Sequence, residues 1–155
     1  MTAPLEVPRH IGIVTSDLDS AMTTLAGQFG LEWNEPSDVS QRFRHRGLAT
    51  DSQLTVVHST AGPMRVELLH GSPGSIWHTD RRAELHHYAY TTPALERDCV
   101  LLAEDGWELE LTVDDDGGRP RDFAYLVKPR RPRIELIQTA PRPGDAVLPA
   151  TDGHI

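Results

Sequence analysis

The pattern of apolar and polar residues predicts the same order of elements in both halves of the chain. In the first half, alternation near residues 9–15 predicts a strand, and Ser16-Asp17 is a plausible N-cap for a helix that ends at Gly30. The apolar stripe of that helix consists of Leu18, Met22, Leu25 and Phe29. Three further strands are expected near residues 41–45, 52–59 and 64–69.

The second half repeats this order. A strand is predicted over residues 85–92, and Pro93 suits the first turn of a helix that stops at Gly106. The apolar stripe of this helix consists of Leu95, Cys99, Leu102 and Ala103. The strands expected after it lie near residues 107–112, 122–128 and 132–138.

Two independent sequence matches indicate an internal duplication. Aligning His10 with His87 also pairs Leu25 with Leu102, and the strand RVELL at residues 65–69 matches RIELI at residues 133–137. We therefore predict an α+β domain over residues 1–140, built from two paired βαβββ modules. The modules cover about residues 8–70 and 85–138, and residues 141–155 are expected to form an irregular tail.

Each module carries a histidine in its first strand and a glutamate in its last, giving the pairs His10/Glu67 and His87/Glu135. If the two sheets pair about a pseudo-twofold axis, these four side chains converge. Two imidazoles and two carboxylates suit a divalent first-row metal ion, and a cation makes buried carboxylates tolerable. Strand alternation favours His87 over His86 as the ligand, because it turns His86 to the opposite face, but the choice stays open.

Each of these residues also has an ordinary structural interpretation. A histidine in a strand is usually a satisfied structural residue, and a glutamate in a strand usually lies on a solvated face. Four coincident placements favour the metal site. The other histidines lack a repeat partner and are interpreted as surface or pocket-wall residues: His45, His58, His70, His78 and His154.

Composition narrows the class of protein. The 155 residues carry a formal net charge of −8, which argues against a nucleic-acid or anionic-membrane partner. The single cysteine, Cys99, excludes an internal disulfide and a cysteine-rich zinc site. No apolar window has the length of a signal peptide or a membrane span, so a cytoplasmic protein is expected.

Four motifs in order resemble the vicinal oxygen chelate superfamily of glyoxalases, bleomycin resistance proteins and dioxygenases. They are HIGIVTSDLDSA, VELLHGSPGSIW, LHHYAY and RIELIQ, and they are most similar to the methylmalonyl-CoA epimerase branch. The resemblance implies a half-open barrel around a divalent ion held by His10, Glu67, His87 and Glu135. It also implies that a ligand carboxylate, Glu135, moves the substrate proton, with Glu67 serving the opposite face.

The resemblance implies a metal-dependent isomerase, epimerase or lyase that acts on a carbonyl or thioester through a metal-stabilised enolate, with Co, Ni, Mn or Zn. Two alternatives remain: an iron-dependent extradiol-type dioxygenase, and a noncatalytic small-molecule-binding or resistance protein. The stretch SQLTVVHST offers His58 but no glutamate, which departs from the epimerase pattern. The expected substrate is a coenzyme A thioester or a secondary metabolite, and this departure favours one that differs from methylmalonyl-CoA. The protein is expected to be a homodimer with all four ligands from one chain.

Overall fold

The computed structural model describes residues 7–61 and 64–139, so the predicted tail at 141–155 lies outside the described residues. The first module contains β1 (His10–Val14), α1 (Leu18–Phe29), β2 (Ser37–His45), β3 (Leu48–His58) and β4 (Arg65–Gly71). The second contains β5 (Glu84–Thr92), α2 (Leu95–Glu104), β6 (Glu108–Val113), β7 (Phe123–Val127) and β8 (Ile134–Gln138). The predicted order of two βαβββ modules is confirmed. The β2–β3 hairpin is longer than the sequence pattern indicated.

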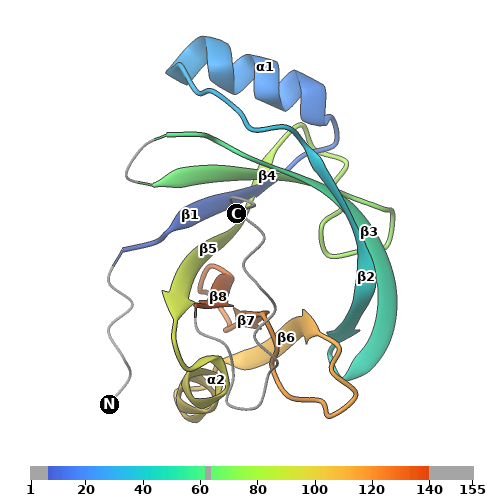
Figure 1. Ribbon diagram of the computed structural model, residues 1–155, viewed down its shortest axis with the longest axis vertical. Helices are drawn as coiled ribbons and strands as arrows, with labels where there is room; N and C mark the ends of the chain where they lie inside the picture. Colours follow the sequence, from blue (N-terminus) through green and yellow to red (C-terminus); the bar gives the residue numbers. More distant parts are fainter. Residues whose placement is uncertain (1–6, 62–63, 140–155) are drawn as a thin grey trace, which may run out of the picture.

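The strands form one barrel in the order β1-β4-β3-β2-β6-β7-β8-β5 (Figure 1). Within the modules, β1 runs parallel to β4 and β5 runs parallel to β8. Between the modules, β1 pairs antiparallel with β5 along its whole length, whereas β2 meets β6 only over residues 43–45. The two first strands therefore lie side by side at the centre of the pseudo-symmetric sheet.

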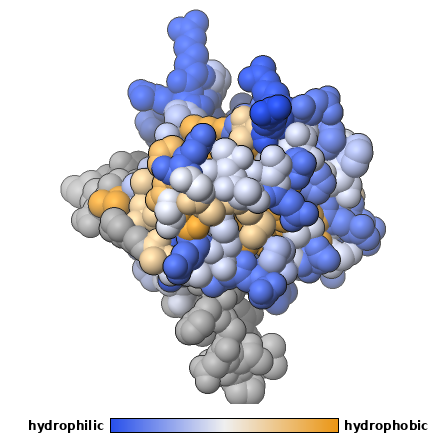
Figure 2. Space-filling view, turned by 90° about the horizontal axis from the view of Figure 1, so that it is seen from above, coloured by the Kyte–Doolittle hydropathy of each residue, from blue (hydrophilic) through white to orange (hydrophobic). Residues whose placement is uncertain are grey.

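Capping fixes the limits of α1 as the sequence predicted. The Asp17 carboxylate accepts a hydrogen bond from the Ser20 backbone N–H, and Gly30 ends the helix in the left-handed conformation at φ 66°. The two helices lie on opposite outer sides of the barrel (Figure 1). The face seen from above is largely hydrophilic, with apolar residues in small groups between polar ones (Figure 2). Neither helix in the described ranges is long and apolar enough to cross a membrane.

Buried apolar side chains form two separate clusters. The outer cluster packs α2 against β7 and β8, through residues Leu95, Cys99, Leu102, Ala124, Leu126, Ile134 and Leu136. The inner cluster fills one side of the barrel, through residues Phe43, Leu54, Leu69, Trp77, Leu111 and Tyr125. Several residues of the inner cluster also line a cavity inside the barrel.

Candidate metal centre

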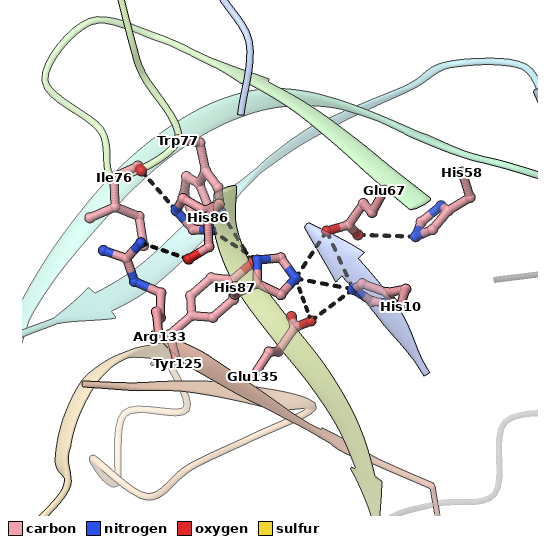
Figure 3. Close-up of polar contacts among 10 residues, drawn as sticks. All are labelled: His10, His58, Glu67, Ile76, Trp77, His86, His87, Tyr125, Arg133 and Glu135. Atoms are coloured by element: carbon pink, nitrogen blue, oxygen red, sulfur yellow. Dashed lines mark hydrogen bonds and ion pairs between the residues drawn. The ribbon is translucent and has the colours of Figure 1, made fainter. Parts of the chain in front are cut away.

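Four side chains from four strands meet inside the barrel. They are His10 of β1, Glu67 of β4, His87 of β5 and Glu135 of β8, and they point toward one another (Figure 3). All four are buried, and His87 is fully inaccessible. The sequence analysis predicted this convergence, and one chain supplies the whole set.

The strand register explains why the four groups meet. In β4 and β8, Glu67 lies opposite Gly12 and Glu135 lies opposite Ala89. Across the junction of the modules, Gly12 in turn faces His87, while Ala89 faces His10. Each imidazole therefore lies across from a small residue of the other module, which leaves space for the ring.

The ligand atoms have the separations that one ion requires. The Nε2 atoms of His10 and His87 are 3.1 Å apart, and both are 3.2 Å from Oε2 of Glu135. Oε2 of Glu67 lies 3.5 Å from the His10 nitrogen and 3.3 Å from the His87 nitrogen. Metal bonds of about 2.1 Å place neighbouring ligand atoms about 3.0–3.4 Å apart in octahedral or tetrahedral geometry.

Two of these atoms, one on each carboxylate, have no hydrogen-bond donor among the described residues, and a metal ion could compensate for this. Oε2 of Glu67 and Oε2 of Glu135 are buried and receive no hydrogen bond from the described part of the chain. Buried carboxylate oxygens are costly without compensation, and a divalent cation between them provides it. The residues present therefore fit a divalent ion.

The four groups of the cluster shift one another's pKa values. Burial lowers the pKa of His10, but Glu135 and Glu67 outweigh it and raise the pKa to about 9. The pKa of His87 is raised by the same carboxylates against the same burial. Burial raises the pKa of Glu67 and Glu135, but the facing imidazoles hold both pKa values below their usual range. A metal ion bound by the two imidazoles would have to displace protons from them.

His58 belongs to this site, although it has no counterpart in the sequence repeat. It lies opposite Glu67 in the β3–β4 pairing, and its Nε2 is 3.0 Å from Oε1 of Glu67 (Figure 3). It also lines the cavity described below. The sequence analysis interpreted His58 as a surface or pocket-wall residue, which agrees with its place in the cavity lining. Nothing in the sequence indicated its ion pair with Glu67.

The interpretation that strand alternation turns His86 away from the site is wrong. The register between β1 and β5 shifts here: Gly12 faces His87, but Ile13 faces Leu85, so His86 is the extra residue of a β-bulge. His86 is consequently buried, with its Nδ1 2.9 Å from Nδ1 of His87. Burial, followed by the charges of Arg133 and His87, lowers the pKa of His86 to about 3.

The cluster lies at the edge of a cavity of about 1070 Å³. His10, His58, Glu67 and Glu135 line one part of it. The rest of the lining mixes aromatic and aliphatic residues such as Phe43, Leu54 and Trp77 with polar and charged ones such as Arg9, Glu35, Arg65 and Asp122. Trp77 and Tyr125 are buried side chains of this lining. Tyr90 instead packs against the outer cluster under α2, because it has the opposite strand parity to His87 and Ala89.

Residues 9–125 match the model of the Glyoxalase/Bleomycin resistance protein/Dioxygenase superfamily, and the chain belongs to this superfamily. None of the curated protein sequences compared with the chain matches it significantly.

Solved structures share the fold at low sequence identity. A hypothetical protein from Bacillus halodurans C-125 is 16% identical with a TM-score of 0.61, and the match covers 89% of this chain and 97% of that one. A methylmalonyl-CoA epimerase from Mycobacterium tuberculosis is 16% identical with a TM-score of 0.58, over 91% and 93% of the two chains. A mutant 4-hydroxymandelate synthase from Streptomyces coelicolor is 13% identical with a TM-score of 0.59, over 92% of this chain and 52% of that chain. At these identities, the similarity establishes the fold.

Proposed function

We propose that the protein is a divalent-metal-dependent isomerase or epimerase, or a lyase, that acts on a carbonyl or thioester substrate. The observation that carries this proposal is the convergence of two imidazole nitrogens and two buried carboxylate oxygens that accept no hydrogen bond from the described residues, at the edge of a large cavity. Co, Ni, Mn or Zn suits this donor set. A bound divalent ion would act there as a Lewis acid that polarises the substrate carbonyl and stabilises an enolate.

The chain's own residues hold the ion and move the proton. His10 and His87 would hold the ion through Nε2 as neutral imidazoles, and the two glutamates would offset its charge. A base must take a proton from the carbon next to the carbonyl, while the C–H electron pair passes into the enolate. Glu135 is the proposed base, because its carboxylate lines the cavity next to the two imidazoles and can reach a substrate bound there.

Epimerisation also needs a proton donor on the other face of that carbon. Glu67 comes from β4, across the site from β8, and its second oxygen is paired with His58. For inversion, Glu67 would begin the turnover protonated and give that proton to the face opposite Glu135, while Glu135 keeps the proton taken from the carbon until solvent exchange resets both groups. A lyase or an isomerase that returns the proton on one face needs only Glu135.

The cavity supports a small-molecule substrate with an apolar portion. Its volume holds far more than the reacting atoms, and its wall includes a group of aromatic and aliphatic residues, among them Phe43, Trp77 and Tyr125. We propose a coenzyme A thioester or a secondary metabolite as the substrate, and a cytoplasmic homodimer with one site per chain. One solved neighbour is a methylmalonyl-CoA epimerase in complex with methylmalonyl-CoA and NH4+, which supports the first choice.

One observation favours a second candidate, an iron-dependent dioxygenase. If Glu67 stays on His58, the remaining ligands are His10, His87 and Glu135, which form a two-histidine, one-carboxylate set with open positions. The 4-hydroxymandelate synthase among the structural neighbours shares the fold. Oxygen uptake by the Fe(II)-loaded protein with catechols or 2-oxo acids would distinguish this candidate from proton transfer.

Solvent hydrogen exchange tests the first proposal. The metal-loaded protein is incubated in D2O with methylmalonyl-CoA and with a panel of 2-substituted thioesters and ketones, and mass spectrometry follows deuterium at the carbon next to the carbonyl. We expect metal-dependent exchange that Glu135→Gln abolishes and His78→Gln leaves unchanged. Equal exchange in wild type and Glu135→Gln would contradict the assignment of the base.

A further inference from the structure

We propose that His86 is a positioning residue that fixes the tautomer and orientation of His87, so that His87 presents a lone pair at Nε2. This inference rests on the proposed metal site and adds to it the group that prepares one of its ligands. His86 and His87 are consecutive residues, but the β-bulge places both rings inside the barrel.

The direction of the hydrogen bonds follows from one backbone carbonyl. Nε2 of His86 is 2.9 Å from the carbonyl oxygen of Ile76, which can only accept a hydrogen bond. The proton of His86 is therefore on Nε2, and Nδ1 of the neutral ring has a lone pair. Nδ1 of His87, 2.9 Å away, donates to that lone pair. The proton of His87 is then on Nδ1, and Nε2 faces Glu67, Glu135 and His10 without one (Figure 3).

The backbone of His86 is fixed as well as its ring. Nη1 of Arg133 donates to the His86 carbonyl oxygen at 3.2 Å, and the same guanidinium holds the Glu110 carboxylate through Nε at 2.6 Å. His86 is thus anchored by Ile76 at its side chain and by Arg133 at its main chain. Histidine ligands commonly donate their other ring N–H to such a partner, which sets the tautomer and orients the ring.

The two half-sites differ in this respect. In the described ranges, Nδ1 of His10 makes no hydrogen bond comparable to that between His87 and His86, and all recorded polar contacts of the His10 ring involve Nε2. The duplication therefore supplies two histidines at equivalent positions, but within the described part of the chain only His87 has a hydrogen-bond partner at Nδ1. His86 should contribute to metal affinity even though it does not face the ion.

Two variants separate the ring from its hydrogen bonds. His86→Phe keeps an aromatic ring of similar size but removes both nitrogens. His86→Asn keeps an oxygen near the position of Nδ1 that can accept from His87. His78→Phe is the matched control, since it removes a histidine on the same connecting segment as Ile76 that is outside the cluster. Zn²⁺ and Co²⁺ affinities are measured on the full chain by competition with a chromophoric chelator.

We expect His86→Phe to weaken metal binding about 10–100-fold, His86→Asn to recover most of that loss, and His78→Phe to bind as wild type. Long-range ¹H–¹⁵N NMR of the wild type should place the proton of His87 on Nδ1, both with Zn²⁺ and in metal-free protein at a pH where the ring is neutral. Unchanged affinity in folded His86→Phe, or a neutral His87 protonated on Nε2, would overturn the inference. If His86→Phe does not fold, an affinity in His86→Asn as weak as in a His87→Ala variant would overturn it as well.

A different result would contradict the proposed function without deciding the role of His86. A wild-type protein that binds neither metal would defeat the metal site, whereas the NMR measurement on metal-free protein decides the role of His86 independently.

Discussion

Gly12 lies directly beneath the imidazole ring of His87. A Cβ atom added to Gly12 would lie 2.0 Å from Cε1 and 2.3 Å from Nδ1 of that ring. No real Cβ tolerates such a contact, and the ring cannot retreat because His86 holds its Nδ1. The space for one metal ligand is thus created by the absence of a side chain on the strand of the other module.

Gly12→Ala should therefore damage the site as well as the fold. We expect the free energy of unfolding to fall by about 1–3 kcal/mol, the usual cost of overpacking, and metal affinity to fall at least tenfold. Chemical denaturation and chelator competition measure the two effects. Gly27→Ala is the matched control: its Cβ would meet nothing within 4 Å, and it lies within α1, so we expect a gain of about 0.5–1 kcal/mol. Equal metal affinity in both variants would contradict this account of Gly12.

Replacing either carboxylate should weaken metal binding while leaving the barrel folded. We expect Glu135→Gln to lower metal affinity more than tenfold and to abolish turnover. Glu67→Gln should also lower the metal affinity. Because Glu135 is still present in this variant, solvent exchange should continue on the face of the carbon that Glu135 serves. Metal content of both variants after dialysis tests this. Unchanged content in both would defeat the four-ligand hypothesis.

The stability of the metal-free protein should decrease as pH rises from about 6.5 to about 9. The pKa of His10 is about 9 in the folded chain and 6.5 as the usual value, so in this range the folded state binds more protons than the unfolded state. The contribution of His10 is complete below pH 6.5, is worth roughly 3 kcal/mol, and is lost as pH passes through 9. Urea denaturation at several pH values should show this slope, and His10→Gln should reduce it. A flat profile would contradict the predicted coupling.

Metal binding should show the opposite dependence on pH. Protons compete with the ion for His10 and His87, so affinity should rise with pH up to about 9, the raised pKa of His10. Equilibrium dialysis between pH 5 and pH 9 measures this. Quantitative retention of the metal at pH 4 would count against histidine ligation.

Assembly of the site within one chain also has a direct test. The duplication supplies both His/Glu pairs in one sequence, and all four groups converge in a single copy. Mixing His10→Ala with Glu135→Ala, after confirmed subunit exchange, should therefore restore no activity. Recovery would mean that neighbouring chains share their sites.

The sequence predicted the barrel and the four converging residues because both depend on the repeat. His10/Glu67 and His87/Glu135 occupy equivalent strand positions, and strand parity alone brings such positions to the same face. Strand parity gave the wrong side for His86, because β5 contains a bulge where a regular strand was expected. A bulge depends on the register between β1 and β5, which are far apart in the chain, so local alternation carries no signal of it.

The same limit applies to His58. His58 contacts Glu67 because the β3–β4 register places the two residues opposite each other, and the sequence repeat contains no second histidine at this position. For Gly12, the sequence alignment paired a glycine with Ala89 but gave no reason for a small residue. The reason lies in the approach of His87 from the neighbouring module, which only the three-dimensional pairing reveals.

The metal content of the purified full chain tests the central claim most directly. The protein is stripped with a chelator, incubated separately with Co, Ni, Mn, Zn and Fe(II) under anaerobic conditions, dialysed, and analysed by inductively coupled plasma mass spectrometry. We predict one equivalent of a divalent ion per chain in the wild type and none in a His10→Ala, His87→Ala double variant that remains folded. A wild-type protein that retains none of these metals, or a double variant that retains a full equivalent, would contradict the account.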